Sequence, residues 1–219
     1  MTELHVTAVN ADEQMKLLYE SAFPEEEQIP WDDLMRLIGE MSLDFTAYYD
    51  DVEQSEQQKP CTALDSTGTQ RKKTKGRFIG FTIVYPCKMF LHQTNPMHEG
   101  ERQKVNWFWY FAVCEELRGK GYGQQILSCV MERYQGQANV FDMESPHQDC
   151  DNIAQRKRRY EFYLRNGFRD TNVYRNYGDI EMTMMMMGQG DFTMQDWDDI
   201  VSELRQYWTW DEPIIRTTE

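Results

Sequence analysis

Residues 106–134 read NWFWYFAVCEELRGKGYGQQILSCVMERY and combine an apolar run, a charged bend and a cluster of glycines. The run from Trp107 to Val113 predicts a strand, and the residues after Gly123 have the apolar spacing of a helix. A glycine turn that begins a helix presents free backbone N–H groups, and the helix dipole adds positive character to them. The stretch therefore predicts a strand–turn–helix unit that binds phosphate oxygens.

The bulk composition predicts one globular domain with appendages. The chain has 219 residues, of which 40% are hydrophobic and 13% aromatic. This length and composition suit a domain over residues 1–190 that buries a core, followed by an acidic, tryptophan-rich helical tail over 191–219. The net charge of -14 argues against non-specific nucleic-acid binding, which needs a basic surface. It serves solubility or favours a cationic substrate.

Targeting and metal signals are absent from the sequence. The chain shows neither a signal peptide nor an apolar run long enough for a membrane span, so no membrane partner is expected. The five cysteines have no paired spacing and read as reduced thiols of a cytoplasmic protein. The cysteines and histidines also lack the spacing of metal ligands, so no metal site is expected.

The periodicity along the chain predicts strands and helices in alternation. A polar segment at about 50–76 reads as a flexible loop, with a docking element for an acidic partner as the alternative. The four methionines Met184 to Met187 read as a strand buried on both faces. The expected strands are 4–9, 44–49, 77–85, 107–113, 139–144, 171–177 and 180–187. The expected helices are 11–22, 31–39, a helix after Gly123, 153–166 and 191–210.

The sequence of the glycine turn does not fit two common kinds of nucleotide-binding site. A phosphate-binding P-loop needs a lysine followed by serine or threonine after its last glycine, and here Gln124 follows Gly123. A dinucleotide fingerprint needs a third glycine and a turn directly after the strand. Ile126 stands at the third glycine position, and the bend from Cys114 to Leu117 separates strand from turn.

A third pattern, R-x-x-G-x-G after a strand and a short charged bend, fits residues 118–123 at every fixed position. It resembles the acyl-CoA-binding motif of the GNAT superfamily of N-acyltransferases. The segment 162–168, FYLRNGF, is similar to a second hallmark of that family, a helix that ends in an aromatic-x-x-x-Gly-Phe pattern. The element order matches from about Leu4 to Gly188. The resemblance implies an α/β fold with a mixed, mostly antiparallel seven-stranded sheet flanked by helices.

The resemblance also implies acetyl-CoA as the acetyl donor and a set of residues that hold it. In this family the fourth strand diverges from the fifth, and the pantetheine arm pairs with the fourth strand's backbone, which needs no particular side chains. By similarity, the turn amides hold the pyrophosphate and two basic side chains add charge. The implied backbone contacts are Phe111, Ala112 and Val113, and the implied turn residues are Arg118, Gly119, Lys120, Gly121, Tyr122 and Gly123.

Two catalytic residues follow from the same resemblance. Tyr163 stands where the family often places the proton donor to the leaving thiolate, and its alternative role is that of a core aromatic. Glu144, at the end of the fifth strand, is the candidate for general base or substrate anchor; its alternative role is to pair with Arg158 or Arg159. Asp142 lies two residues earlier and is expected on the same face.

Two further features bear on the site. Arg156 and Arg159 occupy helix positions where many members of the family carry asparagine and alanine. The run Glu25 to Glu27 lies in the segment that lines the acceptor side in this family, where it attracts a cationic amine or is simply solvated.

The implied function is N-acetyl transfer from acetyl-CoA to a primary amine of a small molecule or a peptide by direct attack. The rival is a non-catalytic acyl-CoA-binding or protein-interaction module on the same fold. The acidic tail, with Trp197, Trp208 and Trp210, supports an interaction role. The sequence names neither the amine acceptor nor an oligomeric state.

Overall fold

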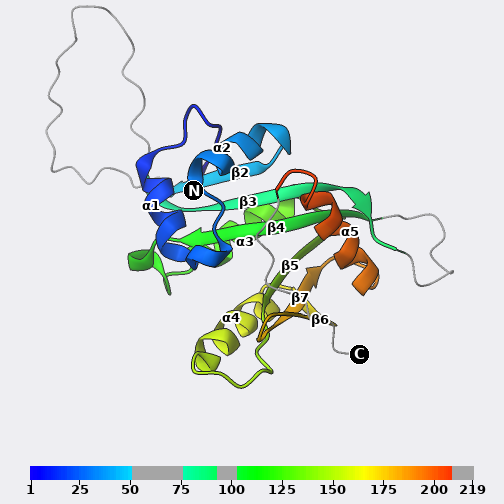
Figure 1. The fold of residues 1–219 in the computed structure, drawn as a ribbon. Helices are drawn as coiled ribbons and strands as arrows, with labels where there is room; N and C mark the ends of the chain where they lie inside the picture. Colours follow the sequence, from blue (N-terminus) through cyan, green and yellow to red (C-terminus); the bar gives the residue numbers. More distant parts are fainter. Residues whose placement is uncertain (51–75, 93–102, 209–219) are drawn as a thin grey trace, which may run out of the picture.

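The computed structural model describes residues 1–50, 76–92 and 103–208. Both strands and helices occur along these parts (Figure 1). The strands are β1 (Thr2–His5), β2 (Asp44–Asp50), β3 (Arg77–Phe90), β4 (Lys104–Val113), β5 (Ala138–Glu144), β6 (Arg169–Tyr177) and β7 (Ile180–Met187). The helices are α1 (Glu13–Ala22), α2 (Trp31–Glu40), α3 (Tyr122–Arg133), α4 (Ile153–Arg165) and α5 (Met194–Leu204), with short 3-10 turns η1 (Glu25–Glu27) and η3 (Glu115–Leu117).

The strands form one seven-stranded sheet in the order β1-β2-β3-β4-β5-β7-β6. Neighbouring strands are antiparallel except for β4 and β5, which are parallel. The helix α3 connects β4 to β5, as a parallel pair requires. The predicted mixed, mostly antiparallel sheet is confirmed.

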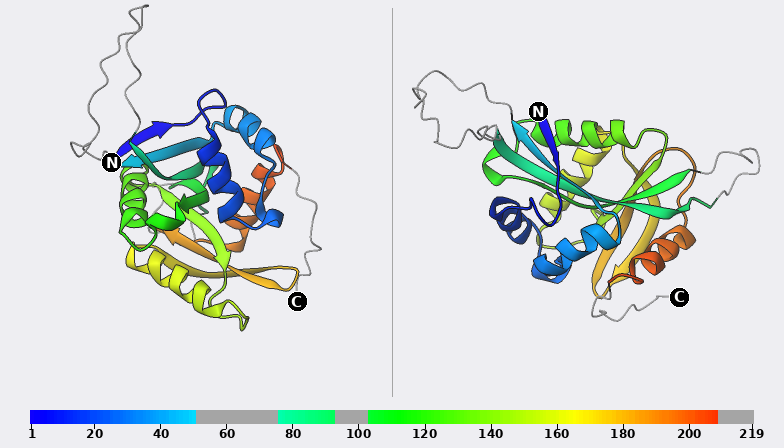
Figure 2. Two further views of the ribbon diagram at one scale, coloured as in Figure 1. Left: turned by 90° about the vertical axis from the view of Figure 1, so that its left-hand side faces the viewer. Right: turned by 90° about the horizontal axis from the view of Figure 1, so that it is seen from above.

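Helices cover both faces of the sheet and divide the core in two. One face carries α1, α2 and α5, and the other carries α3 and α4 (Figure 2). Alternate residues of β5 serve the two sides, because side chains along a strand point to opposite faces. Val140 belongs to the cluster under α1, α2 and α5, whereas Phe141 and Met143 belong to the cluster under α3 and α4. We call the face under α1, α2 and α5 the acceptor face, after the role that the resemblance implies for it, and the opposite one the α3/α4 face.

Three of the four methionines that were predicted to be buried lie in the core, and the fourth, Met187, is half-buried. Met184, Met185 and Met186 are fully buried in β7, which lies between β5 and β6. Met184 and Met186 pack on the acceptor face and Met185 on the opposite one. Unbranched side chains fill both layers of the sheet here.

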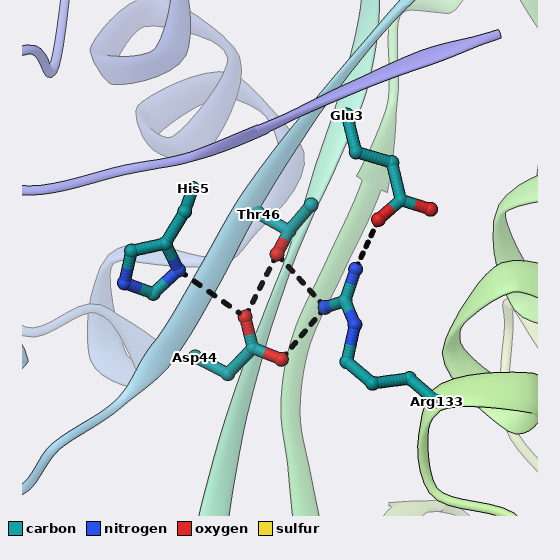
Figure 3. Close-up of a pocket in the computed structure, with 5 residues that line it drawn as sticks. All are labelled: Glu3, His5, Asp44, Thr46 and Arg133. Atoms are coloured by element: carbon teal, nitrogen blue, oxygen red, sulfur yellow. Dashed lines mark hydrogen bonds and ion pairs between the residues drawn. The ribbon is translucent and has the colours of Figure 1, made fainter.

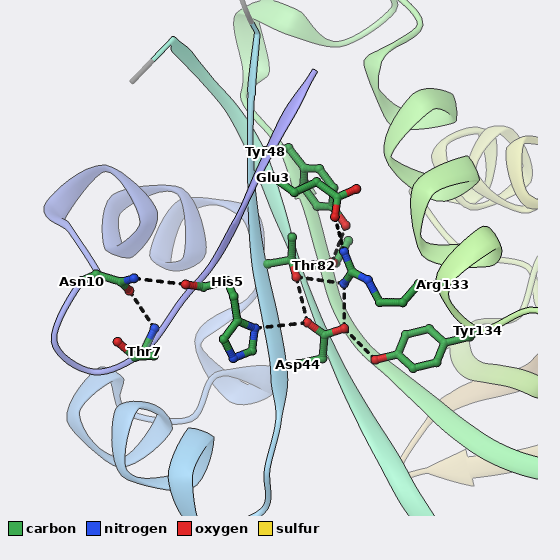
Figure 4. A network of polar contacts seen from close by, with 10 residues as sticks. Glu3, His5, Thr7, Asn10, Asp44, Tyr48, Thr82, Arg133 and Tyr134 are labelled. Atoms are coloured by element: carbon green, nitrogen blue, oxygen red, sulfur yellow. Dashed lines mark hydrogen bonds and ion pairs between the residues drawn. The ribbon is translucent and has the colours of Figure 1, made fainter. Parts of the chain in front are cut away.

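The predicted N-terminal strand ends earlier than expected. We predicted a strand from Leu4 to Val9, but β1 stops at His5 and a turn follows (Figure 4). Asn10 closes this turn, since its side chain accepts from the N–H of Thr7 at 2.7 Å and donates to the carbonyl of His5 at 3.0 Å. Val9 is 96% exposed. An asparagine that bonds to the nearby backbone outweighs the β-propensity of one valine.

The tail helix α5 is part of the core. Trp197 and Ile200 are fully buried on the acceptor face. Two buried carboxylates join α5 to β3: Glu203 accepts from the Tyr85 hydroxyl at 2.5 Å, and Asp196 accepts from the N–H of His92 at 2.8 Å. Trp210 and the interior of the predicted 50–76 loop lie outside the described residues.

Other expectations are addressed only for the described residues. None of their helices is long and apolar enough to cross a bilayer. The cysteines in these parts, Cys87, Cys114, Cys129 and Cys150, are free thiols.

A polar network joins the outer strands β1 and β2 to the C-terminal end of α3 (Figures 3 and 4). Arg133 donates to Asp44 at 2.6 Å and also pairs with Glu3. The hydroxyl of Tyr134 donates to Asp44 at 2.6 Å, and that of Thr46 at 2.8 Å. These residues border a surface hollow of about 380 Å³. Because they pair with one another, we interpret them as a structural joint between the two strands and α3.

The Asp44→Asn variant tests this joint. Burial works to raise the pKa of Asp44, but hydrogen bonds from Tyr134, Thr46 and Arg133 outweigh it and hold the pKa below its usual value. A lowered pKa stabilises the fold above the unfolded-state value, and the gain is lost as pH falls through the folded-state pKa. We expect a loss of about 2 kcal/mol at pH 7 in urea unfolding, shrinking below about pH 4.

Glu40→Gln is the matched control. Glu40 pairs with Arg36 on the exposed surface of α2, where an ion pair contributes less than about 1 kcal/mol. If the Asp44→Asn variant were no less stable at pH 7 than this control, the network would not hold the two elements together.

Candidate active site

The parallel strands β4 and β5 pair over only a short length. Their partners are Val105 with Ala138, Asn106 with Asn139, and Trp107 with Val140. Beyond these pairs β4 runs on to Val113 and β5 to Glu144, with no pairing between them. The strands therefore diverge, and the facing edges of their C-terminal halves are not paired with each other; we call the space between these edges the gap.

A β-bulge lies where this divergence begins. In the β3–β4 register, Ile83 faces Tyr110 while the next residue, Val84, faces Phe108. Trp109 is therefore an extra residue in β4. An extra residue bends its strand and increases the local twist, which turns the second half of β4 away from β5.

The three predicted backbone residues of β4 lie in this second half. Phe111, Ala112 and Val113 pair with β3 on one side, and their other edge faces the gap. Arg118, which is exposed, donates from Nε to the carbonyl of Val113 at 3.2 Å. The first residue of the glycine motif thus lies against the end of the strand that we expect the ligand to follow.

The glycine turn has the geometry of an anion site. Gly119 and Gly121 have φ values of +74° and +86°, and Gly121 is the N-cap of α3 with no side chain to bond the first-turn amides. A Cβ on either glycine would meet no atom within 4 Å, so the turn is open. Lys120, between them, is exposed. Positive φ and free helix amides together explain why glycine is needed here.

Gly123 brings α4 close to the turn. A Cβ at Gly123 would lie 3.4 Å from Cζ of Phe162 and 3.7 Å from Cζ of Phe111. The rings of Phe111 and Phe162 stack with centroids 6.5 Å apart. The two predicted motifs, 118–123 and 162–168, therefore meet in space. Tyr122 is held separately by its hydroxyl, which donates to Asp50 at 2.5 Å.

Tyr163 lies beside the gap on the α3/α4 face. It is 8% exposed, and its ring is 4.3 Å from that of Phe141 in β5, centroid to centroid. Burial raises the pKa of Tyr163 to about 12, although the nearby charge of Arg159 lowers it. The phenol is therefore protonated at neutral pH and is able to donate a proton.

Glu144 is held by two arginines of α4. Arg156 reaches one carboxylate oxygen at 2.8 Å and Arg159 the other at 2.6 Å. We expected Arg158 or Arg159 as the alternative partners, and Arg159 is one of the two found. Both carboxylate oxygens are thus engaged, and Arg156 is itself buried. This contact fastens α4 to the end of β5.

Asp142 has different neighbours from Glu144, although both were expected on one face. Burial first, and the charge of Glu27 next, raise the pKa of Asp142 to about 7, against smaller opposing effects from a backbone N–H and from Arg175. Glu27 belongs to η1, between α1 and α2. The two carboxyl groups are more than 100 positions apart in the chain, so the sequence carried no signal for this influence on the pKa of Asp142.

No metal site accompanies these residues. In the described part of the chain, no cluster of three or more histidine, cysteine or acidic side chains is arranged to hold an ion.

Comparison with known proteins agrees with this geometry. A sequence profile of the acetyltransferase (GNAT) domain matches residues 72–170. A protein of Bacteroides thetaiotaomicron assigned to the GNAT acetyltransferase family is 21% identical, with a TM-score of 0.62 over 94% of this chain and 97% of its own. No curated protein sequence matches.

Two ligand-bound structures share the fold. An aminoglycoside 6'-N-acetyltransferase complexed with coenzyme A has a TM-score of 0.53 at 13% identity, over 85% of this chain and 96% of its own. Arabidopsis thaliana NAA60 in complex with acetyl-CoA has 0.54 at 11% identity, over 84% and 96%. Residues 72–170 thus match an acetyltransferase (GNAT) domain, and the fold agrees with the predicted resemblance to that superfamily.

The Gly121→Ala variant tests the backbone of the turn. Because a Cβ there meets no neighbour, the change acts only through the positive φ, and we expect a loss of about 1 kcal/mol in urea unfolding. Gly39→Ala is the control, since Gly39 lies inside α2 with equal space around it; there alanine should stabilise by up to about 1 kcal/mol. Equal effects from both variants would show that the turn is not constrained.

Proposed function

We propose that the protein is an N-acetyltransferase that transfers the acetyl group of acetyl-CoA to a primary amine of a small molecule or peptide. The gap between β4 and β5 is the observation that carries this proposal. It leaves the edge of Phe111 to Val113 without a strand partner, and an extended ligand arm is able to complete that edge. The open glycine turn lies at the end of the same strand, where amides suit a pyrophosphate.

In this proposal, different residues of the chain bind the cofactor and transfer protons. The amides of Gly119 to Gly123 bind the phosphate oxygens, and Arg118 and Lys120 add positive charge. Acetyl-CoA, when bound, supplies an acetyl thioester that an amine attacks directly. Tyr163 protonates the departing sulfur, and the raised pKa of its phenol supports this role because it keeps the proton available. A carboxylate at the end of β5 accepts the proton of the amine.

Cofactor binding is measured by thermal unfolding with acetyl-CoA and with CoA. Both should raise the midpoint by several degrees, since ligand at 100 times its Kd stabilises by about 2.7 kcal/mol. Lys120→Ala should weaken binding about tenfold, because it removes a charge-assisted contact to phosphate. Lys16→Ala, an exposed lysine of α1, is the control and should bind as the parent does. No shift with either nucleotide contradicts the proposal.

Catalysis is measured by thiol release from acetyl-CoA in the presence of polyamines, amino sugars, aminoglycosides, amino acids and peptides. Tyr163→Phe should keep cofactor binding and lower kcat at least about 100-fold. Tyr160→Phe, on the same helix with its hydroxyl 3.2 Å from Asp170, is the control and should keep kcat within a few-fold. Binding of acetyl-CoA with no thiol release for any amine would instead support a non-catalytic binding module.

A further inference from the structure

We propose that Glu144 is a positioning residue, which through Arg156 and Arg159 holds α4 on β5 so that Tyr163 stays beside the gap. This inference deepens the proposed function and rests on it, because Tyr163 is the proton donor of that reaction. The sequence made Glu144 the candidate for general base or substrate anchor, and the contacts around its carboxylate favour this different role.

The helix α4 has little apolar surface with which to hold itself on the sheet. Its buried side chains are Arg156 and Tyr163, and Tyr160 and Phe162 are half-buried. Leu164, although apolar, is 41% exposed. A helix on the surface of a sheet is normally held by a stripe of buried apolar side chains. Because α4 lacks a full stripe, its position depends strongly on individual contacts.

Two of these contacts join α4 to β5, and one is apolar while the other is charged. The ring of Phe141 lies 4.3 Å from that of Tyr163, centroid to centroid. Closer to the end of the strand, Glu144 pairs with Arg156 at 2.8 Å and with Arg159 at 2.6 Å. The two arginines lie one and two helical turns before Tyr163, on the same face of the helix. The charged contact therefore fixes the half of α4 that precedes the tyrosine.

Arg156 also bonds to the loop before α4. Its guanidinium donates to Oδ1 of Asn152 at 2.9 Å and to Oε1 of Gln148 at 3.2 Å. The same oxygen of Gln148 accepts from the N–H of Glu181 in β7 at 3.0 Å. The buried arginine thus connects α4 with both β5 and β7. Removal of the Glu144 carboxylate would leave its buried charge without an opposite charge, which is costly.

The same contacts make Glu144 a poor proton acceptor. Each of its carboxylate oxygens is engaged by one arginine. An ion pair would have to break before either oxygen could take a proton from an amine. The proton of the amine then passes to an acceptor other than Glu144.

The position of Tyr163 is expected to be sensitive to this fastening. Without the charged contact, α4 would keep its contact with Phe141 and be free to pivot about it. Proton transfer requires hydrogen-bond distance between donor and acceptor, and a misplacement of about 1 Å is able to cost up to about 100-fold in rate. Loss of Glu144 should therefore slow the reaction through Tyr163.

The kinetic test is a double-mutant cycle of Glu144→Gln and Tyr163→Phe, measured as thiol release from acetyl-CoA with spermidine, kanamycin and tyramine. Glu144→Gln alone should lower kcat about tenfold and leave the Kd for acetyl-CoA within about threefold. In the Tyr163→Phe background the same change should lower kcat less than about twofold, because nothing remains to be positioned. Equal losses in both backgrounds would give Glu144 a role of its own, such as that of base, and overturn the proposal. So would an unchanged kcat in Glu144→Gln alone.

Glu161→Gln is the matched control. Glu161 pairs with Arg165 at 3.7 Å within the same helix, and both side chains are exposed. The change removes the same kind of charge from α4 without touching the contact to β5. It should leave kcat unchanged in both backgrounds, and a loss equal to that of Glu144→Gln would show that any charge on α4 has this effect.

Two variants of Arg159 test the contact from the side of the helix. The Arg159 side chain is 41% exposed, so its replacement should not prevent folding. Arg159→Lys keeps a positive charge beside Glu144 and should retain more of kcat than Arg159→Ala. Equal losses in the two variants would contradict a charged fastening. Arg159→Ala also replaces Glu144→Gln in the double-mutant cycle if the latter does not fold.

Amide hydrogen exchange gives a readout that needs no acceptor. Glu144→Gln should speed exchange in the peptide that covers α4 at least about tenfold, and Glu161→Gln should not. Unchanged exchange in Glu144→Gln would overturn the fastening, even where acetyl-CoA binds and thiol is released. If the parent released no thiol with any amine, the proposed function would fall and the catalytic part of this inference with it. The exchange rates would still decide whether Glu144 holds α4 on β5.

Discussion

The pairing between β4 and β5 ends after Trp107 and Val140, and the site depends on that end point. An antiparallel sheet with all of its ladders complete would leave no backbone groups for a ligand in its interior. Here the bulge at Trp109 bends β4, and the two strands separate while each stays fastened to its other neighbour. The interior of the sheet thereby acquires two free edges, which are normally found only at its margins.

The residues around the gap are held by contacts on both faces. On one face, Gly123 permits Phe162 and Phe111 to approach the start of α3, which joins the two motifs. On the other, Tyr110 holds η1 over the strands. The glycine turn and its basic residues thus lie at the start of α3, and η1 with its glutamates lies on the opposite face of the sheet.

Local features of the fold could be predicted from the sequence, and long-range ones could not. The glycine turn, the buried methionine strand and the helix with Tyr163 each depend on residues within a short window. The predicted end of the N-terminal strand was wrong, because the side chain of Asn10 bonds to the backbone and turns it after His5. Glu144 was expected as general base or substrate anchor, with Arg158 or Arg159 as its alternative partner, and it pairs with Arg156 and Arg159. These partners belong to a helix, and the periodicity of a strand does not encode which helix side chains it meets.

The described part of the tail packs back on the domain. Its acidic, tryptophan-rich composition is equally typical of a surface segment. The structure instead places Trp197 in the core and Arg175 over its ring. Arg175 also pairs with Asp198, and the ring of Tyr177 lies 6.4 Å from that of Trp197, so α5 is fastened to β6.

The link between β3 and α5 has a consequence for how the chain matures. Tyr85 and Glu203 are 118 residues apart, and His92 and Asp196 are 104 apart. A ribosome therefore delivers β3 long before the carboxylates that its end requires. Until α5 emerges, the hydroxyl of Tyr85 and the N–H of His92 must be solvated, and the acceptor face of the sheet lacks its Trp197 cover. Completion of this sheet thus waits until α5 has been made, and the partly built sheet is the stage most exposed to aggregation.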